Sequence, residues 1–572
     1  MAVENYKTIE TDLLVVGGGT AGAPLAAKAA ESGLDVTILE KSNIARSGNI
    51  AHGVDSYGIF PHGVNVRDLL PMYYERMTSV FQGPGRWCDE NIDYVIFSKA
   101  WWAVEELERM GIPMKWDDGE YYWTPHMIHR NGLKLGLRVH WHDVKPKMAK
   151  MCAERGVHTL NRTMLIDIMT DNGRATGATA FDTRTGEFMV IKAKAVAICS
   201  GMYCRMYQPE TALIWKYQMR YHYCPASCSG DGWAAAYRAG AGLAHLDDAS
   251  WAIRIRDDIT CSQGNFSNND GITSRQVYWD GTPASPYHAH SYKGAREAED
   301  LAKVPVYHTF EHLPDDWIQR MELNYLDERM VSLKLAADRG FNPRNHWYEM
   351  TSYKPLQMMM IHGIQVDEHF ESPYLKGLYA AGDAAAGVGG AYGACTSGLI
   401  IGDEIKAAID QTAAPVIHDD QVQKSYERAF GPTQVEDGTE PLELEVSLRH
   451  IAEKYIGALQ NEGRILEGIR RFDSIKREFL PELMAKTPHE MMRALETRNT
   501  MQLLELHLID SLKRRETRNN HVRLDYPEMD DTRTNFVTIN RMENGEDIYE
   551  RIEEPTLKPE YAEALKDGGV MI

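Results

Sequence analysis

The stretch Leu13-Leu14-Val15-Val16-Gly17-Gly18-Gly19-Thr20-Ala21-Gly22 decides the fold of this chain. An apolar run of strand length enters a Gly-x-Gly-x-x-Gly turn, then an alanine-rich segment at 23–32, and then a second apolar run that ends at Glu40. In such a unit Gly17 makes the tight turn, Gly19 lets backbone N–H groups approach a pyrophosphate, and Gly22 lets the helix pack closely on the strand. Three consecutive glycines also suit a flexible turn. Here the two flanking strands, the helix and the acid Glu40, which is placed to bind a ribose, all agree. Their combination predicts a dinucleotide site.

Length and charge limit the class of protein. The chain has 572 residues, a formal net charge of −20 at pH 7 and a hydrophobic fraction of 43%, so we expect about two to four domains. No apolar run is long enough to cross a membrane, and the polar start of the chain does not resemble a signal peptide. The acidic balance argues against nucleic acid or an anionic membrane as the main partner. A local arginine cluster could still bind an anionic substrate.

The cysteines are interpreted as reduced, buried thiols. There are eight of them, and none forms a C-x-x-C pair. This usage is typical of a cytoplasmic protein. We therefore expect a cytoplasmic chain that binds no metal and carries no iron–sulfur cluster of its own.

The remaining pattern predicts an α/β fold in which a Rossmann-like domain is interrupted by an insertion. Residues 159–198 alternate as strands and return to the parallel sheet, 377–380 form another strand, and a helix is expected over 399–409. Helical spacing over 443–515 predicts a bundle, followed by an irregular tail. The predicted division is 1–245 and 351–415 for the dinucleotide-binding domain, 246–350 for an α+β capping and substrate domain, and 416–572 for a C-terminal helical domain and tail.

Four segments together resemble the flavoprotein family of succinate dehydrogenase and fumarate reductase. They are the glycine turn, the small-residue segment 46–53, Ala-Ala-Gly-Asp at 380–383, and the run 514–527. The resemblance implies FAD bound in extended form, with Glu40 at the adenosine ribose, Asp383 near the pyrophosphate and ribityl chain, and a helix after Gly398 directed at the flavin. The residues that it assigns to the FAD site are Gly17, Gly19, Thr20, Ala21, Gly22, Glu40, Lys41, Ser47, Gly48, Asn49, Gly201, Asp231, Gly382, Asp383, Ser397, Gly398 and Leu399.

Departures from the family pattern narrow this resemblance. In the quinone-linked members, a histidine two residues after the arginine of the ring segment (46–53) carries a covalent flavin. Counted from Arg46, that position is Gly48, which predicts noncovalent FAD. The dicarboxylate-binding motifs are missing, and the histidine of His-Pro-Thr falls at Ala252. The chain is more similar to the alpha subunit of dissimilatory adenylylsulfate reductase, which shares Arg-Ser-Gly in the ring segment and Ser-Gly in the final helix.

Four residues are expected on the substrate side of the flavin. The resemblance places a substrate arginine at Arg254, where a planar cation would neutralise an anion, and a histidine at His362, which would protonate a product or donate to a flavin adduct. Trp251 would stack on a flat ring, and His52 lies in the ring segment. Three of these positions also have a structural alternative: ion pairing for Arg254, interface packing for Trp251, and backbone contacts for His362. His52 would hydrogen-bond the flavin ring or face the substrate.

Two classes of function follow. The first is an FAD-dependent oxidoreductase that reacts with a small anionic substrate and exchanges electrons with a separate ferredoxin-like iron–sulfur subunit in a hetero-oligomer. The second is an electron-relay subunit of a larger complex. The insertion favours the enzyme, because a relay needs no substrate lid. Within the enzyme class, the alternative is a fumarate-reductase-like ene-reductase or dehydrogenase of an organic acid or thioester.

Overall fold

The computed structural model describes most of the chain. The described residues are 6–52, 56–58, 89–123, 134, 136–139, 143–207, 225–248, 250–251, 275–283, 306–319, 331–349, 355–357, 361–457, 459–518, 521–530, 536–553 and 555–566.

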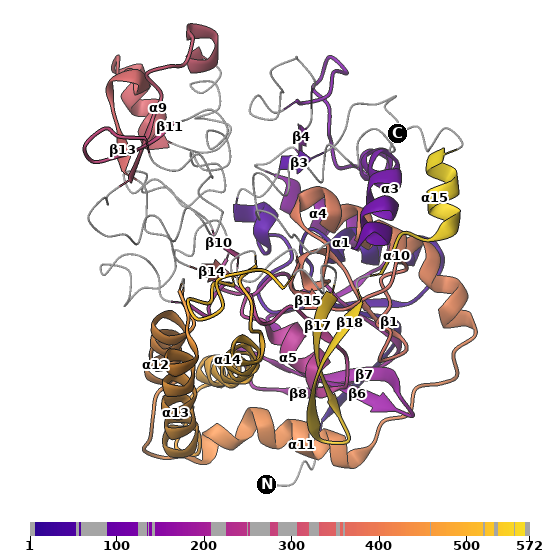
Figure 1. The fold of residues 1–572 in the computed structure, drawn as a ribbon. Coiled ribbons are helices and arrows are strands. Elements are labelled where there is room, and N and C mark those ends of the chain that lie inside the picture. Colours follow the sequence, from indigo (N-terminus) through magenta and orange to yellow (C-terminus); the bar gives the residue numbers. More distant parts are fainter. Residues whose placement is uncertain are drawn as a thin grey trace.

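The largest sheet among the described residues is mixed, and its strands β1, β6, β7 and β8 lie toward the lower right in Figure 1. Its strands are β1 (Lys7–Val16), β2 (Val36–Glu40), β5 (His158–Asn161), β6 (Thr163–Asp171), β7 (Arg174–Asp182), β8 (Phe188–Ile198) and β16 (Leu378–Ala380). Among the described residues the order is β5-β2-β1-β8-β7-β6, and β16 pairs with β8 beyond this path. The pairs β1–β2, β1–β8, β2–β5 and β8–β16 are parallel, whereas β6–β7 and β7–β8 are antiparallel. The predicted α/β fold and both predicted returns to the sheet are confirmed.

The last four residues of β1 are all apolar because both faces of the sheet are covered there. From Leu13 to Val16 every residue is buried. The helices near the sheet are α1 (Gly22–Glu31), α3 (Glu90–Arg109), α4 (Val144–Glu154), α5 (Asp231–Arg238), α10 (Gly390–Asp410) and α11 (Asp419–Phe430). Helix α1 contacts α4 and α10, and both α5 and α11 contact β6. The small side chains of α1 allow this close layering, since its alanines at 23, 26, 27 and 29 are fully buried.

Helix α10 differs from the sequence prediction. It begins at Gly390 rather than at 399, so Gly398 lies inside the helix and not before it. The glycines and alanines of 390–398 are weak local signals. Packing of α10 against α1 stabilises these extra turns, because most helical stability in proteins comes from tertiary contacts. The expectation that a helix N-terminus after Gly398 points at the flavin is therefore wrong, and the N-terminus lies at Gly390.

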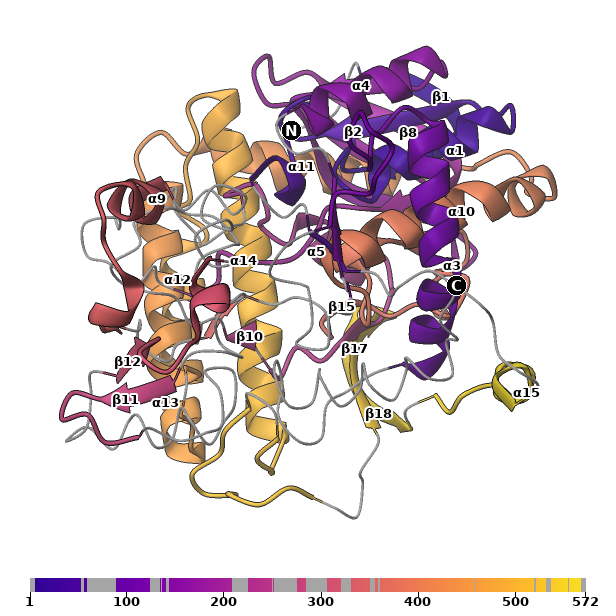
Figure 2. The ribbon, with the colours of Figure 1, turned by 90° about the horizontal axis from the view of Figure 1, so that it is seen from above.

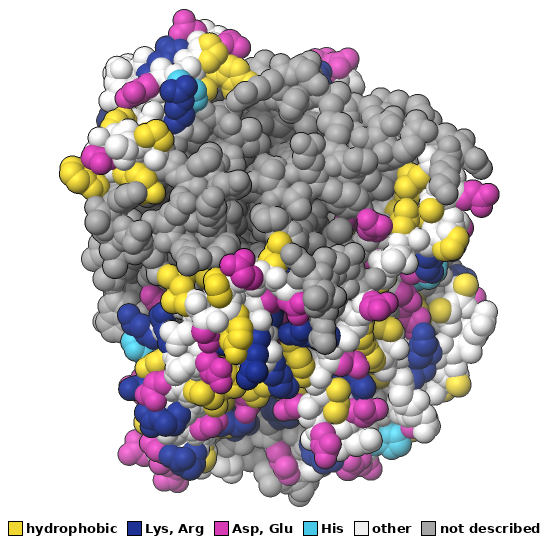
Figure 3. Space-filling model, in the orientation of Figure 1, with side chains coloured by type: hydrophobic (Ala, Val, Ile, Leu, Met, Phe, Trp, Pro, Cys, Tyr) yellow, Lys and Arg dark blue, Asp and Glu magenta, His cyan; other side chains and the backbone are white. Residues whose placement is uncertain are grey.

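The C-terminal part contains the predicted helical bundle. Helices α12 (Pro441–Tyr455), α13 (Glu462–Phe479) and α14 (Pro488–Lys513) pack on one another, and α14 also contacts α5 of the central domain (Figure 2). Lys and Arg side chains are interspersed with Asp and Glu on the described surface in Figure 3.

The tail is more regular than predicted. It forms the hairpin β17 (Phe536–Glu543) and β18 (Glu546–Glu553), followed by α15 (Pro559–Lys566). Strand β17 pairs with β9 (Leu243–Ala244), which in turn pairs with β15 (Gly363–Ile364). The expected irregular tail is thus wrong, because pairing with β9 orders a segment whose sequence is polar.

Small peripheral elements complete the described structure. They are β3 (Ser56–Gly58), β4 (Gly136–Arg138), β10 (Ser250–Trp251), β14 (Pro355–Gln357), β11 (Arg275–Tyr278), β12 (Val306–Thr309), β13 (Tyr348–Glu349) and α9 (Val331–Asp338). The division of the chain at 245, 350 and 415 stays a prediction. No helix among the described residues is both long and apolar enough to cross a membrane.

Candidate cofactor site

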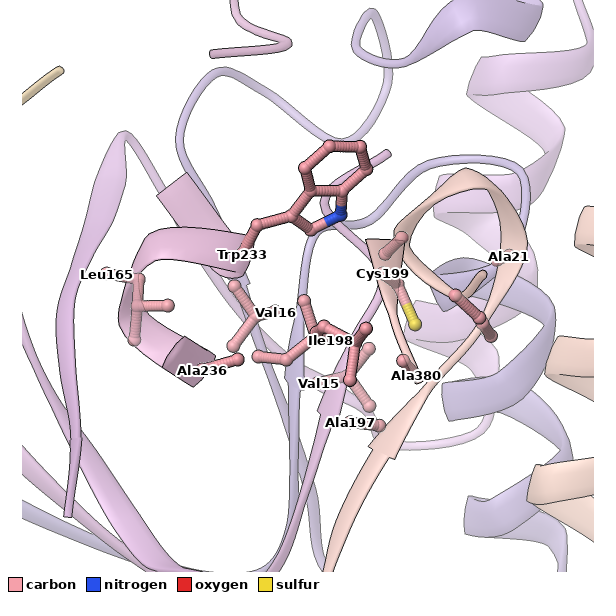
Figure 4. Close-up of a cluster of buried hydrophobic side chains, with 14 of the residues drawn as sticks. Val15, Val16, Ala21, Leu165, Ala197, Ile198, Cys199, Trp233, Ala236 and Ala380 are labelled. Atoms are coloured by element: carbon pink, nitrogen blue, oxygen red, sulfur yellow. The ribbon is translucent and has the colours of Figure 1, made fainter. Parts of the chain in front are cut away.

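A pocket lies at the carboxyl ends of β1, β2 and β8. The starts of α5 and α10 and the glycine turn before α1 also line it. Its empty space, including open solvent at its mouth, is about 950 Å³. Beneath it, Val15 and Val16 of β1 pack with Ala197 and Ile198 of β8 and with Trp233 of α5 (Figure 4). This apolar floor holds the strand ends in place.

The glycine turn is shaped by backbone contacts. Gly17 has a φ of +100°, and a Cβ there would lie 2.5 Å from the carbonyl oxygen of Cys199. A Cβ on Gly22 would lie 1.9 Å from the carbonyl oxygen of Gly17. Ala21, at the N-cap of α1, provides no side-chain cap. In the first turn of α1 the N–H of Ala23 donates to the carbonyl of Gly19 at 3.2 Å and Pro24 has no N–H. This leaves the N–H of Gly22 for an anion such as a pyrophosphate.

Gly18 is held from both sides. Its N–H donates to Glu40 Oε2 at 2.9 Å, and its carbonyl accepts from Lys145 Nζ at 2.5 Å. Glu40 Oε1 also accepts from the N–H of Ser42 at 2.8 Å. Burial lowers the pKa of Lys145 to about 8, although Glu40 opposes this shift. A carboxylate has about four acceptor sites, so Glu40 retains capacity for ribose hydroxyls.

Lys41 lies in the pocket wall, but its ammonium points into an ion-pair network. Lys41 Nζ donates to Ser229 Oγ at 2.6 Å, to Asp231 Oδ2 at 2.6 Å and to Glu496 Oε1 at 2.7 Å. Burial acts to lower the pKa of Lys41, but the two carboxylates outweigh it and raise the pKa. Asp231 also accepts from Asn499 Nδ2 at 2.9 Å.

Two buried oxygens in the wall suit a hydroxyl-rich ligand. Asp383 Oδ1 and Ser47 Oγ have no hydrogen-bond partner among the described residues. Burial raises the pKa of Asp383 to about 7, and an N–H of Gly390 partly offsets the shift. Unpartnered buried oxygens of this kind are costly. Hydroxyl groups of a ribose or ribityl chain would supply the missing donors. The polar groups of this pocket are therefore of the kind that would suit FAD.

Most of the residues predicted for the FAD site line this pocket. Those in the wall are Gly17, Gly19, Thr20, Ala21, Glu40, Lys41, Ser47, Gly48, Asn49, Gly201, Asp231, Gly382 and Asp383.

Four predicted residues do not line it. Gly22, Gly398 and Leu399 are packed behind the wall, and Ser397 supports it because its Oγ accepts from the N–H of Gly382 at 3.1 Å. A Cβ on Gly398 would lie 2.3 Å from the carbonyl oxygen of Ala21, so this glycine brings α10 against α1.

Sequence reasoning missed several residues of the site. The wall also includes 163–165 of β6, 227–230 before α5, and Gly390, Ala391 and Ala394 of α10. Of these, only the residues of α10 could have been predicted from the sequence, because small residues at positions 390, 391 and 394 share one helix face and allow close approach. Lys145 and Glu496 act from behind the wall and had no local signal.

The substrate-side residues are less completely described. Arg254 lies outside the described residues, and the side chains of His52 and Trp251 are not described, although their backbones lie in a 3₁₀ turn (Asn49–His52) and in β10. His362 is fully buried directly before β15. It is absent from the wall of the pocket.

His362 lies in a cluster of buried histidines. Extending the β9–β15 register by one residue sets it opposite His245, which has a φ of +57°. Burial lowers the pKa of His245 to about 3 and that of His507 to about 4. His507 Nε2 lies 2.6 Å from the hydroxyl of Tyr207. Burial thus disfavours the cationic forms of His245 and His507, which suits both side chains to hydrogen bonding.

Comparisons with known proteins agree with this geometry. A family model described as FAD binding domain matches residues 12–399, and one described as Fumarate reductase flavoprotein C-term matches residues 445–562. The fumarate reductase flavoprotein subunit of Mycobacterium tuberculosis is 23% identical over 569 residues, covering 92% of this chain and 93% of that protein.

Solved structures share the fold. Adenylylsulfate reductase from Archaeoglobus fulgidus has a TM-score of 0.80 at 20% identity, with 97% of each chain covered. Adenosine-5-phosphosulfate reductase in complex with sulfite as a covalent adduct has a TM-score of 0.79 at 20% identity, again with 97% of each chain covered. The first family model spans more than half of the sequence, and the second continues through the C-terminal helices. The chain therefore belongs to the flavoprotein family of succinate dehydrogenase and fumarate reductase, and it is an FAD-dependent oxidoreductase.

Proposed function

We propose that this chain is the flavoprotein subunit of an adenylylsulfate-reductase-like enzyme, which reacts with a small sulfur- and phosphate-bearing anion at noncovalent FAD. The observation that carries the proposal is the glycine at position 48 of the ring segment. Gly48 has a φ of +83°, and a Cβ there would lie 3.1 Å from Gly19 Cα. The resemblance places here the histidine that attaches FAD in quinone-linked relatives, and a side chain at this position would have a strained backbone and a contact tighter than ordinary van der Waals distance.

The residues of the wall each have a proposed task toward FAD. The N–H groups at the start of α1 would receive the pyrophosphate, Glu40 the adenosine ribose, and Asp383 the ribityl hydroxyls. Bound FAD supplies the redox chemistry, and the protein supplies position and electrostatics. Asp383 is proposed as the main acceptor, because its Oδ1 is buried and lacks a donor among the described residues.

The substrate side is proposed from the sequence resemblance. Arg254 would hold the anion, Trp251 would stack on a flat ring, and His362 would orient or protonate the substrate, with His52 beside the flavin. Two other buried histidines, His245 and His507, have pKa values lowered by burial, and His245 lies opposite His362 in the extended register of β9 and β15.

Electrons are proposed to leave through a ferredoxin-like iron–sulfur subunit, with which the chain would form a cytoplasmic hetero-oligomer. The eight cysteines lack the spacing of a cluster-binding motif, and the five described ones are buried thiols outside any disulfide. Isolation from the native host should therefore recover a small iron–sulfur protein with this chain. A lone chain that completes turnover with its physiological donor would contradict this part of the proposal.

The second candidate is a fumarate-reductase-like enzyme acting on an organic acid or thioester. The whole-length similarity to the Mycobacterium tuberculosis subunit favours it. Against it stand the missing dicarboxylate motifs and the crowded Gly48.

An anaerobic flavin titration separates the two candidates. Sulfite plus AMP should bleach the oxidised flavin if the first proposal is correct. Sulfite with adenosine, which lacks the phosphate, is the matched control and should act much more weakly. If sulfite plus AMP leaves the spectrum unchanged while fumarate reoxidises the reduced flavin, the adenylylsulfate-reductase-like function is wrong and the fumarate-reductase-like function is supported.

A further inference from the structure

Helix α14 of the C-terminal bundle reaches the wall of the cofactor pocket. Arg493, Glu496 and Asn499 are spaced three residues apart and share one helix face. Glu496 and Asn499 contact Lys41 and Asp231 through hydrogen bonds of 2.7 and 2.9 Å. Both contacted residues line the pocket. The bundle is therefore connected to the cofactor site by side chains, and α14 lies next to α5 (Figure 2).

Glu496 is the centre of this connection. Its side chain is 2% exposed. One carboxylate oxygen accepts from Lys41, and the other accepts from Arg205 Nη1 at 2.6 Å and from Arg493 Nη1 at 2.5 Å. These cations hold the pKa of Glu496 well below its ordinary value, although burial opposes them. Since three cations from different elements share this carboxylate, it fixes where Lys41 lies.

Asn499 positions the second pocket residue. It donates to Asp231 Oδ1, while Asp231 Oδ2 accepts from Lys41 and from Ser229 Oγ at 2.9 Å. Asn499 Oδ1 in turn accepts from Arg238 Nη1 at 3.0 Å. The carboxylate of Asp231, at the start of α5, is thus held between α14 and the segment after β2. A shift of α14 moves it.

We propose that Glu496 and Asn499 are positioning residues for the FAD site, so that FAD binding and docking of the C-terminal bundle stabilise each other. Linkage requires this to be reciprocal: if the docked bundle strengthens FAD binding, bound FAD must strengthen docking by the same factor. Neither residue lines the pocket, so each acts through Lys41 or Asp231. The inference presupposes that FAD occupies the pocket described above.

Two alanine variants on α14 form a matched test. Asn499 and Gln502 both accept from Arg238 Nη1, at 3.0 and 2.8 Å, but of the two only Asn499 is bonded to Asp231. Asn499→Ala should weaken FAD affinity about fivefold or more and change the shape of the bound-flavin absorption spectrum. Gln502→Ala should keep affinity within about twofold and leave the spectrum unchanged. Equal effects of the two variants would overturn the proposal.

Hydrogen exchange on the unaltered protein gives a test that needs no variant. FAD added to the FAD-free protein should slow amide exchange over 493–500 of α14 more than over 462–479 of α13. Helix α13 has no described hydrogen bond to the wall. Equal protection of the two helices would overturn the linkage. FAD binding itself is measured separately, by the fluorescence of the released flavin. A protein that binds no FAD would overturn the assignment of the pocket.

Discussion

Gly398 offers the sharpest test of how the pocket is built. In Gly398→Ala, the new Cβ would lie 2.3 Å from the carbonyl oxygen of Ala21, and ordinary contact begins at 3.4 Å. Helices α1 and α10 must therefore separate by about 1 Å at this point. Overpacking of this kind costs about 1–3 kcal/mol, and the better helix propensity of alanine returns at most about 1 kcal/mol. We expect a net loss of about 1 kcal/mol.

The effect on FAD should exceed the effect on stability. Ala21, at the N-cap of α1, and Ala394, on α10, lie in the pocket wall, so separating the two helices displaces the wall itself and should weaken FAD binding. The assays are the FAD dissociation constant, followed by flavin fluorescence, and the thermal unfolding midpoint.

Gly463→Ala on α13 is the control for Gly398→Ala. Its nearest neighbour outside the adjacent residues is 3.6 Å from the new Cβ, so it should be neutral or slightly stabilising. If Gly398→Ala binds FAD within about twofold of wild type and unfolds at the same temperature, close approach of the two helices is not what shapes the pocket.

Three further predictions follow from the site. Acid precipitation should release all of the yellow colour, because Gly48 cannot carry a covalent flavin; colour left in the pellet would refute this. In FAD-free protein, the pKa of Asp383 is raised from 3.8 to about 7, so its folded form binds more protons than its unfolded form between these values and stability falls as pH rises. Wild type should lose about 2.5 kcal/mol more than Asp383→Asn between pH 5 and pH 8 in urea unfolding, and equal losses would show that the carboxyl is not desolvated. Arg254→Ala should raise the concentration of anion needed for half-maximal flavin bleaching by about tenfold or more, whereas unchanged titration would remove Arg254 from the site.

The local parts of the fold were predictable from the sequence. The strand, turn and helix over 13–31 are specified by residues adjacent along the chain. Their apolar run and their glycine spacing both indicate the same dinucleotide-binding unit. The same holds for α12, where Leu444, Leu448 and Ile451 recur at helical spacing and are buried. In these segments the sequence pattern and the tertiary packing agree.

Contacts between distant segments were not predictable. The hydrogen bond from Lys41 to Glu496 joins residues 455 positions apart, and neither residue carries a local sign of its partner. The early start of α10 was missed for a related reason, since Gly390 and Gly393 are poor helix formers that packing against α1 makes helical. His245 was also missed, because a positive φ at a non-glycine residue is imposed by surrounding strands.

The pocket wall is assembled from segments that leave the ribosome at widely separated times. Its first residue is Val16 and its last is Ala394, and the carboxylate that fixes Lys41 arrives only at Glu496. A nascent chain that ends before α14 therefore lacks the complete site, even though its first βαβ unit is already present. Loading of FAD with full affinity is consequently a late event in the biogenesis of this protein, and a truncation anywhere before residue 496 should yield a chain that captures the cofactor poorly.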